Sequence, residues 1–193
     1  MNRTLFVGDV HSCAWELGAL LDKVRPTRVI LVGDVFNKGP DPDGTWALVK
    51  QWGCESVMGN HDLAVLSKAK RGERCAPEDA LVWLAGLPMM LRGDGWVAVH
   101  GGLSPDGDTT LEQAVSLRRW PDDSSPDHPF WWELYQGEPT VIYGHDAVRG
   151  LQDHRPRTLG LDTGCVYGGR LTGYLWEQQR IVSVKAKRPY RPV

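Results

Sequence analysis

Residues 4–9 read TLFVGD, a short apolar run that ends in glycine and is followed by an acidic residue. The pattern returns as VILVGD at 29–34, SVMGN at 56–60 and VIYGH at 141–145, and WVAVH at 96–100 ends directly in histidine. Short apolar runs bounded by turn residues predict buried strands. Because the carboxyl ends of strands in an open α/β fold converge on one crevice, these five ends predict a single polar site.

The side chains at these strand ends are typical ligands of divalent metal ions. They are Asp9, His11, Asp34, Asn60, His100 and His145. Glycine before such a residue removes the Cβ atom and permits the turn that aims the next side chain inward. Asp34, on the second of two adjacent strands, is the best candidate to bridge two ions. Turn aspartates and core histidines are the alternative interpretation, and five such ends argue against it.

Two carboxylates against two dications would leave a positively charged centre. Such a centre attracts phosphate and lowers the pKa of a bridging water, so that a nucleophile exists near neutral pH. The donor set favours Mn²⁺, and Fe²⁺, Zn²⁺, Co²⁺ or Mg²⁺ would also fit. The pattern therefore predicts a phosphohydrolase with two metal ions.

The first half of the chain predicts alternating strands and helices. Ser12 is a candidate N-cap for a helix that runs to Val24, and a turn at 41–44 leads into a second helix. Residues 62–87 indicate helix in two pieces, divided near Pro77. This alternation is typical of an α/β fold.

The second half of the chain predicts strands separated by loops. Strands are expected at 89–91 and 95–100, and residues 104–139 indicate loops with short helices. Residues 158–161, 170–176 and 180–184 are expected to close the fold as antiparallel strands. We assign residues 1–184 to one domain and residues 185–193 to a basic, loosely ordered C-terminal tail.

Composition restricts the other classes of function. The chain has 193 residues, 41% of them hydrophobic, and a net charge of -2, which argues against membrane or stable nucleic-acid binding. The apolar run at the N-terminus is too short for a signal peptide, so a cytoplasmic location is expected. The four cysteines form no CxxC pair, and free, mostly buried thiols are expected rather than a structural zinc site or disulfides.

In their order, the motifs resemble those of the calcineurin-like metallophosphoesterase superfamily. They read GDVHS at 8–12, GDVFNKGP at 33–40, GNHD at 59–62, HGGLSP at 100–105 and GH at 144–145. Together with LDTGC at 161–165 and GGRLT at 168–172, they are most similar to the bacterial branch of phosphoprotein phosphatases, which includes symmetrical diadenosine tetraphosphate hydrolases.

The resemblance implies a four-layer α/β/β/α sandwich with two mixed sheets. It implies that Asp9 and His11 hold the first metal, that Asn60, His100 and His145 hold the second, and that Asp34 bridges them. His61 resembles the general acid that protonates the leaving oxygen. A neutral, hydrogen-bonded histidine is the alternative.

The chain departs from the family pattern beside His61 and in length. Asn37 stands where the family has aspartate, which predicts a weaker or lower-pH acid step because an amide does not stabilise a charged imidazole as a carboxylate does. Lys38 replaces arginine and binds phosphate as a point charge. Arg118, Arg119 or Arg149 is a candidate second cation, or else a solvated surface residue. The short segments from His61 to His100 and from His100 to His145 predict a more open site.

We therefore expect hydrolysis of diadenosine tetraphosphate or a related nucleoside polyphosphate by a metal-bridging hydroxide. A serine/threonine or dual-specificity phosphoprotein phosphatase is the alternative, favoured by the open site. A binding protein on an inactive phosphoesterase fold is a third hypothesis, and the complete ligand set argues against it.

Overall fold

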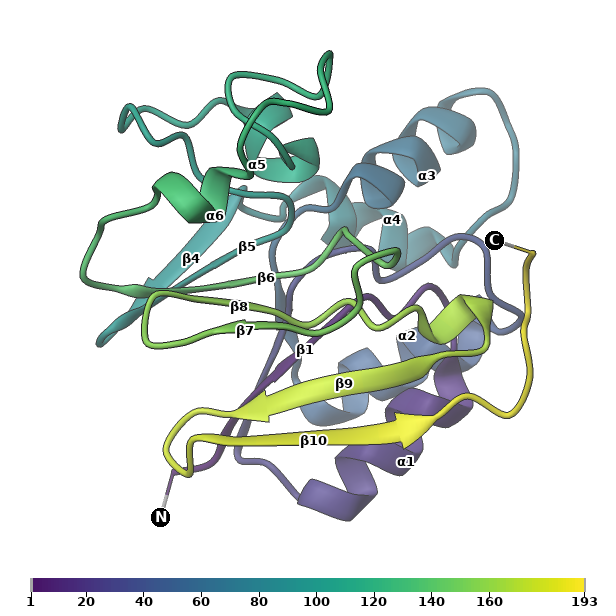
Figure 1. Ribbon diagram of the computed structural model, residues 1–193. Helices are drawn as coiled ribbons and strands as arrows, with labels where there is room; N and C mark the ends of the chain where they lie inside the picture. The colour runs from purple at the N-terminus through teal and green to yellow at the C-terminus, as the bar shows by residue number, and fades with distance from the viewer. Residues whose placement is uncertain (1, 193) are drawn as a thin grey trace.

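The computed structural model describes residues 2–192 and contains two five-stranded sheets (Figure 1). Met1 and Val193, the outer ends of the expected domain and tail, lie outside the described residues. In spatial order, the first sheet comprises β10 (Arg180–Lys185), β9 (Arg170–Leu175), β1 (Thr4–Val7), β2 (Arg28–Leu31) and β3 (Glu55–Ser56). The second comprises β4 (Met90–Gly93), β5 (Trp96–Val99), β6 (Thr140–Tyr143), β8 (Thr158–Gly160) and β7 (Gln152–His154).

Both sheets are mixed, as expected. Strands β1, β2 and β3 are parallel, and β9 and β10 pair antiparallel beside them. Strands β5, β6 and β8 are parallel, with β4 and β7 antiparallel at the edges. The parallel strands of each sheet therefore end at a common edge, where the polar residues that follow them can meet.

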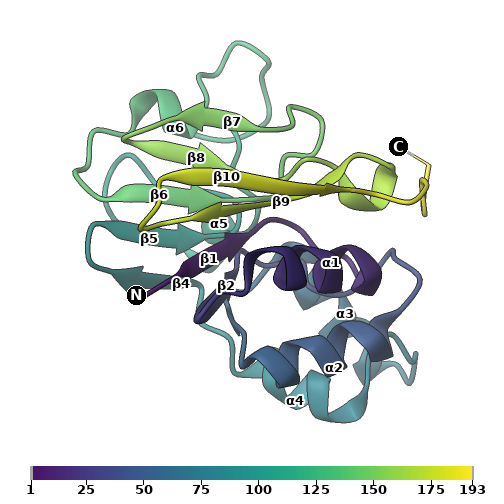
Figure 2. The ribbon, with the colours of Figure 1, turned by 90° about the horizontal axis from the view of Figure 1, so that it is seen from below.

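Helices cover the outer face of each sheet (Figure 2). The first sheet is covered by α1 (Ala14–Val24), α2 (Pro42–Trp52), α3 (Asn60–Lys70) and α4 (Glu78–Ala85). The second is covered by the short helices α5 (Leu111–Ser116) and α6 (Trp131–Leu134). None of the helices between residues 2 and 192 is both long and apolar enough to cross a membrane.

Alternation along the strands explains the four layers. Leu5 and Val7 of β1 point into a core shared with α1–α4, whereas Phe6 points into a second core between the two sheets. On β5, Ala98 faces this inter-sheet core and Val97 packs outward against α5 and α6. Because side chains alternate across a strand, each strand serves two cores and the α/β/β/α sandwich follows.

Three sequence-based expectations at the element level are wrong. Ser12 does not cap α1: its φ is 58°, and Cys13 occupies the N-cap position without a side-chain hydrogen bond. Strand β3 is only Glu55–Ser56, because the chain leaves the sheet two residues before Gly59. Strand β8 pairs antiparallel with β7 but parallel with β6, so it does not close the fold as a simple antiparallel strand.

The C-terminal segment after β10 is held against the body rather than loosely ordered. The backbone N–H of Lys187 and the hydroxyl of Tyr190 both donate to the Glu16 carboxylate, at 3.0 and 2.8 Å. The Nε of Arg191 donates to the carbonyl of Lys38 at 2.9 Å. These contacts tie the tail to α1 and to the loop after β2.

Candidate metal centre

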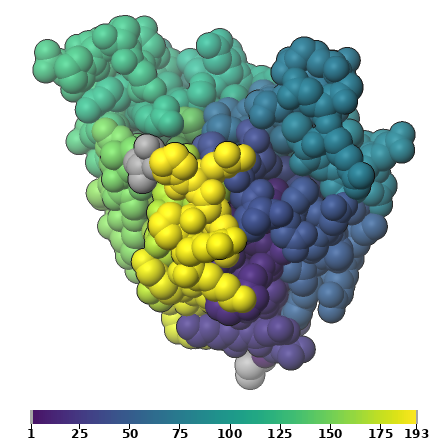
Figure 3. All heavy atoms as spheres, turned by 90° about the vertical axis from the view of Figure 1, so that its right-hand side faces the viewer, coloured from purple at the N-terminus to yellow at the C-terminus, as the bar shows by residue number. Residues whose placement is uncertain are grey.

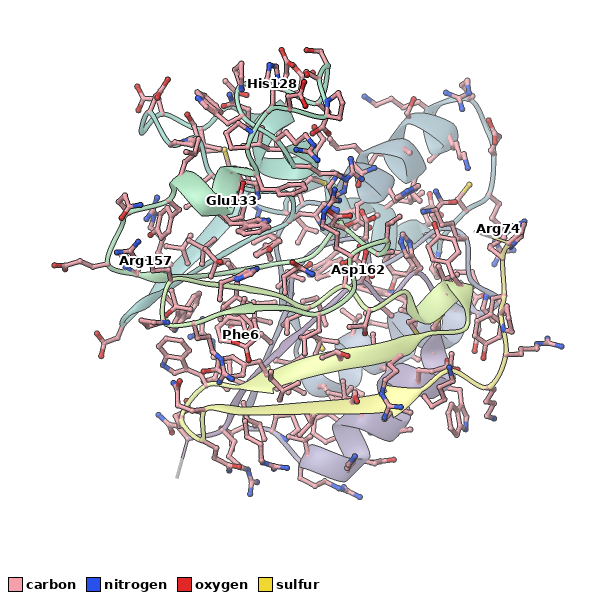
Figure 4. All side chains as sticks on the ribbon, in the orientation of Figure 1. Phe6, Arg74, His128, Glu133, Arg157 and Asp162 are labelled. Atoms are coloured by element: carbon pink, nitrogen blue, oxygen red, sulfur yellow. The ribbon has the colours of Figure 1, made fainter. Side chains whose placement is uncertain are left out.

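The polar residues after the parallel strands line a cavity of about 610 Å³ at the common edge of the two sheets. Its floor and walls include Asp9, His11, Asp34, Asn60, His61, His145 and Asp162. Figure 4 places Asp162 in the centre of the molecule and His128 at its upper margin. His128 contacts Asp122 and His154 stacks on Trp132, and neither lines the cavity.

Asp34 lies between two histidines. Its Oδ2 is 3.5 Å from Nε2 of His11, and its Oδ1 is 3.4 Å from Nε2 of His100. Oδ1 also accepts a hydrogen bond from the backbone N–H of His61 at 2.8 Å. One carboxylate therefore faces both halves of the predicted ligand set.

Asn60 forms the second meeting point. Its Oδ1 is 3.0 Å from Nε2 of His100 and 3.1 Å from Nδ1 of His145. Asn60 is the first residue of α3, and His100 and His145 directly follow β5 and the β6–Gly144 turn. Residues far apart in the sequence thus meet where β3 of the first sheet and β5 and β6 of the second sheet end.

The backbone determines which ring nitrogen of each histidine carries the proton. Nδ1 of His100 lies 2.8 Å from the carbonyl of Val32, Nδ1 of His11 lies 3.3 Å from that of Phe36, and Nε2 of His145 lies 3.1 Å from that of Ser116. A carbonyl only accepts, so each of these nitrogens is the N–H donor. The other nitrogen then presents a lone pair to the site, which is the arrangement of metal-ligating histidines.

Burial keeps these histidines neutral. It lowers the pKa of His100 to about 3 and that of His145 to about 2, and it places the pKa of His11 well below its usual value. The lone pairs of His100 and His145 therefore face the acceptor oxygen of Asn60 with no proton between them. A cation among these atoms resolves the repulsion.

The carboxylates show the same need for a positive charge. Burial, together with repulsion from Asp162 and Asp34, raises the pKa of Asp9 well above its usual value. Burial and the neighbouring Asp62 do the same for Asp34. Within residues 2–192, no lysine or arginine lies within 4.0 Å of either carboxylate. The residues present therefore fit divalent cations.

Asp162 is a site residue that strand-end reasoning missed. It follows β8 as Asp9 follows β1, lines the cavity and accepts a hydrogen bond from the N–H of Gly164 at 3.0 Å. Burial raises its pKa to about 6. The signal was present, because the run 158–161 ends directly in this aspartate.

Asp62 supports the site without lining the cavity. Its carboxylate accepts from the backbone N–H groups of Val35 and Gly59, at 3.0 and 3.2 Å. These bonds connect the loop after β2, which carries Asp34, to the start of α3, which carries Asn60. Asp62 therefore holds the two loops in register.

The contacts of His61 agree with the departure seen in the sequence. Nδ1 of His61 lies 3.0 Å from Nδ2 of Asn37, whose Oδ1 accepts from Lys68 at 3.4 Å. Because the ammonium of Lys68 can only donate, the Asn37 NH₂ faces His61 and leaves the imidazole proton on Nε2. Burial and the charges of Lys38 and Lys68 lower the pKa of His61 to about 4.

The predicted phosphate-binding cations separate into two groups. Lys38, Arg118 and Arg149 line the cavity, and the ammonium of Lys38 donates to the Tyr167 hydroxyl at 2.7 Å. Arg119 lies outside the cavity, so its prediction as a phosphate ligand finds no support. Its backbone bridges to Phe130, and its guanidinium lies over that ring and donates to the carbonyl of His128.

Glycine is required where the loops approach one another most closely. A Cβ atom at Gly59 would overlap the carboxylate of Asp34, and one at Gly144 would overlap that of Asp9. The glycines before Asn60 and His145 therefore allow the backbone to pack directly on the carboxylates.

The sequence profile of the calcineurin-like phosphoesterase family matches residues 2–181. The chain belongs to this family. As a calcineurin-like phosphoesterase, it is a metal-dependent hydrolase of phosphoric esters or anhydrides. The two mixed sheets with outer helices agree with the fold expected from the resemblance.

Curated relatives of this phosphoesterase are named as symmetrical bis(5'-nucleosyl)-tetraphosphatases. The protein of Chromohalobacter salexigens is 30% identical, with 88% of this chain and 93% of the relative covered. That of Mannheimia succiniciproducens is 36% identical, with 97% and 98% covered. The first alignment extends over 254 positions, more than the 193 residues of this chain, so the relative carries insertions.

Two solved structures share the fold of this chain. A crystal structure provisionally described as a diadenosine tetraphosphatase is 32% identical, with a TM-score of 0.89 over 96% of this chain and 94% of that one. The two chains are therefore of similar length. A protein serine/threonine phosphatase from Saccharomyces cerevisiae shares the fold at 13% identity, with a TM-score of 0.65 over 99% of this chain and 81% of that one.

Proposed function

We propose that this phosphoesterase hydrolyses the polyphosphate chain of dinucleoside polyphosphates and cleaves diadenosine tetraphosphate symmetrically. The observation that carries the proposal is the row of cations beside the ligand cluster. Lys38, Arg118 and Arg149 line the same cavity as Asp34 and His61, which suits a polyanion longer than one phosphate. The relatives named as symmetrical tetraphosphatases support this substrate class.

The proposed metal ligands are those expected from the sequence. Asp9 and His11 would hold one ion, Asn60, His100 and His145 the other, and Asp34 both. Bound divalent ions, for which we propose Mn²⁺, neutralise phosphoryl charge and lower the pKa of water. Asp162 lies beside Asp9, and its negative charge would strengthen binding of the ion held by Asp9 and His11.

Among the side chains, His61 is proposed to complete the reaction. In its protonated form the ring gives its Nε2–H to the leaving phosphate oxygen and returns to neutral imidazole, and the contact between Nδ1 and Asn37 holds the ring in place. Lys38, held by Tyr167, and the two arginines neutralise the phosphoryl oxygens and orient the chain of phosphates.

Product analysis tests this function. Protein loaded with Mn²⁺ is incubated with diadenosine tetraphosphate, a serine/threonine phosphopeptide and an aryl phosphate, and the products are separated by ion-exchange chromatography. Two molecules of ADP are expected from each diadenosine tetraphosphate. ATP plus AMP would indicate asymmetrical cleavage. Turnover of the phosphopeptide alone would contradict the proposal and favour a phosphoprotein phosphatase. The Asp34→Asn variant serves as the blank.

A further inference from the structure

A second cluster of potential ligands lies behind the catalytic cavity. The Sγ atoms of Cys13 and Cys165 and one carboxylate oxygen of Glu16 all lie within 4.8 Å of one another. All three residues are buried, with Cys13 and Glu16 fully excluded from solvent. Cys13 caps α1, Glu16 lies in its first turn, and Cys165 begins the short 3₁₀ helix η1 (Cys165–Tyr167). None of the three lines the cavity.

The Glu16 carboxyl is only half satisfied. Its Oε1 accepts from the backbone of Lys187 and from the Tyr190 hydroxyl, whereas Oε2 is buried without a hydrogen-bond partner. Within residues 2–192, no lysine, arginine or histidine nitrogen lies within 4.0 Å of this carboxyl. A buried acidic oxygen without a cation is unfavourable, because neither water nor a counter-charge compensates its desolvation.

The spacing fits a coordinated ion. Two sulfurs bound to tetrahedral zinc at about 2.3 Å are separated by roughly 3.8 Å, and a sulfur and an oxygen by somewhat less. Donors within 4.8 Å of one another reach this geometry with small side-chain movements.

We propose that Cys13, Cys165 and Oε2 of Glu16 form a separate binding site for a thiophilic divalent cation, Zn²⁺. Binding would release the two thiol protons to solvent and form two zinc–sulfur bonds. Soft thiolates distinguish this site from the nitrogen and oxygen donors of the catalytic cluster, which suit harder ions. The hydroxyl of Tyr190, which donates to Oε1 at 2.8 Å, holds the Glu16 carboxyl beside the two cysteines.

The position of the site suggests a structural role. Cys13 lies two residues after His11, and Cys165 lies three residues after Asp162. An ion between the sulfurs would tie together the loops that carry these two cavity residues. The tail covers the site, since Tyr190 also donates its backbone N–H to the carbonyl of Val166 at 2.8 Å. Figure 3 shows this C-terminal segment in yellow against the purple N-terminal residues.

Cobalt substitution tests the proposal, because thiolate ligands give Co²⁺ a near-ultraviolet charge-transfer band that nitrogen and oxygen ligands do not give. The full chain is produced under reducing conditions in minimal medium supplemented with Co²⁺. We expect the band in the wild-type protein and its loss in Cys165→Ser and Cys13→Ser. Cys54→Ser is the matched control, since Cys54 is also buried but lies outside the cluster, and it should keep the band.

A second measurement covers variants that fail to fold. In folded wild-type protein loaded with Zn²⁺, modification of the thiols by a mercurial should release one ion, and peptide mapping should show that the release accompanies modification of Cys13 and Cys165. Folded wild-type protein that binds Co²⁺ without the band would overturn the proposal. The same holds for a band that survives both serine variants, or for a mass of the metal-free protein that is two hydrogen atoms lower, which indicates a disulfide.

Discussion

The two walls of the cavity are built differently. The loops after β1 and β2 place five non-glycine residues in the left-handed region, namely His11, Ser12, Asp34, Asn37 and Lys38. The loops after β5, β6 and β8 place only His145 there. On the first wall, residues 8–13 and 32–36 are all buried, whereas Val148 on the second is 87% exposed. One wall is therefore strained and closed, and the other is open.

The difference shows which wall needs extra contacts to hold strained backbone in place. Each left-handed non-glycine residue costs of order 1–3 kcal/mol and persists only when its surroundings determine it. Backbone bonds from Val35 and Gly59 to Asp62 provide that support on the first wall. The second wall carries Arg118 and Arg149 on exposed loops, where side chains can adjust to a substrate. We infer that the strained wall fixes the bridging carboxylate of Asp34, whereas the open wall adds His100 and His145 to the ligand set and carries the arginines that contact substrate.

The largest effect is expected from Asp34→Asn on the strained wall. Loss of the charge shared by both ligand groups should remove metal and lower kcat by roughly 10³-fold or more, because metal stabilisation is worth several kcal/mol. Metal content by mass spectrometry and kcat with diadenosine tetraphosphate provide the measurement. Asp146→Asn, a carboxylate of the open wall, is the matched control and should retain metal. Equal metal content in Asp34→Asn and Asp146→Asn would contradict the proposed difference between the two walls.

His61→Ala should separate chemistry from metal binding. Because His61 donates a proton and lies outside the ligand set, we expect metal content to be unchanged and kcat to fall by roughly 10²–10⁴-fold. The readouts are metal analysis and steady-state kinetics. The surface variant His128→Ala should behave as wild type. Turnover that persists in His61→Ala would exclude the acid role.

Substitution of the arginines tests the open wall. Arg149→Gln and Arg118→Gln should each raise KM about tenfold and leave metal content unchanged, because a charge-assisted hydrogen bond contributes roughly 1.5–3 kcal/mol and is partly screened here. Arg119→Gln is the control, since its guanidinium lies outside the cavity. If Arg119→Gln matched the other two variants, substrate would have to extend beyond the cavity.

The smallest effect is expected from Asn37→Asp. A carboxylate beside Nδ1 of His61 favours the protonated imidazole, so the pKa of His61 should rise from about 4, by roughly 1–3 units. Activity that depends on the protonated ring is lost as pH rises through this pKa, so the descending limb of the pH–rate profile should move to higher pH. Asn37→Ala, which removes orientation without adding charge, should not produce this shift. An unchanged profile in Asn37→Asp would contradict the proposed contact.

Local pattern predicted the strained wall well. Apolar runs ending in glycine and a polar residue predicted the positions of Asp9, Asp34 and Asn60. Such runs and the turn residues that end them can be recognised from neighbouring residues alone. The same reasoning missed the three-residue strand β7, which lacks an apolar run. It also assigned Ser12 as the cap of α1, although packing of the loop after β1 moves the cap to Cys13.

The open wall was harder to predict from sequence. Arg118 and Arg119 are adjacent and equally basic, but the bridge between Arg119 and Phe130 turns only Arg118 toward the cavity. Asp162 lies within the LDTGC motif at 161–165, and it reaches the cavity because β8 lies parallel to β6. Pairing partners distant in the chain decide both cases.

The sequence by itself determined the reaction class and the candidate ligands, since the residue types that follow each strand and the order of the motifs can be recognised from neighbouring residues. Only the tertiary structure decided which nitrogen of each histidine faces the site, because distant carbonyls accept the other N–H. Only the tertiary structure, too, placed Cys13, Glu16 and Cys165 together, because their spacing contains no ligand motif. Local chemistry selects the donors, and long-range packing determines where their lone pairs point.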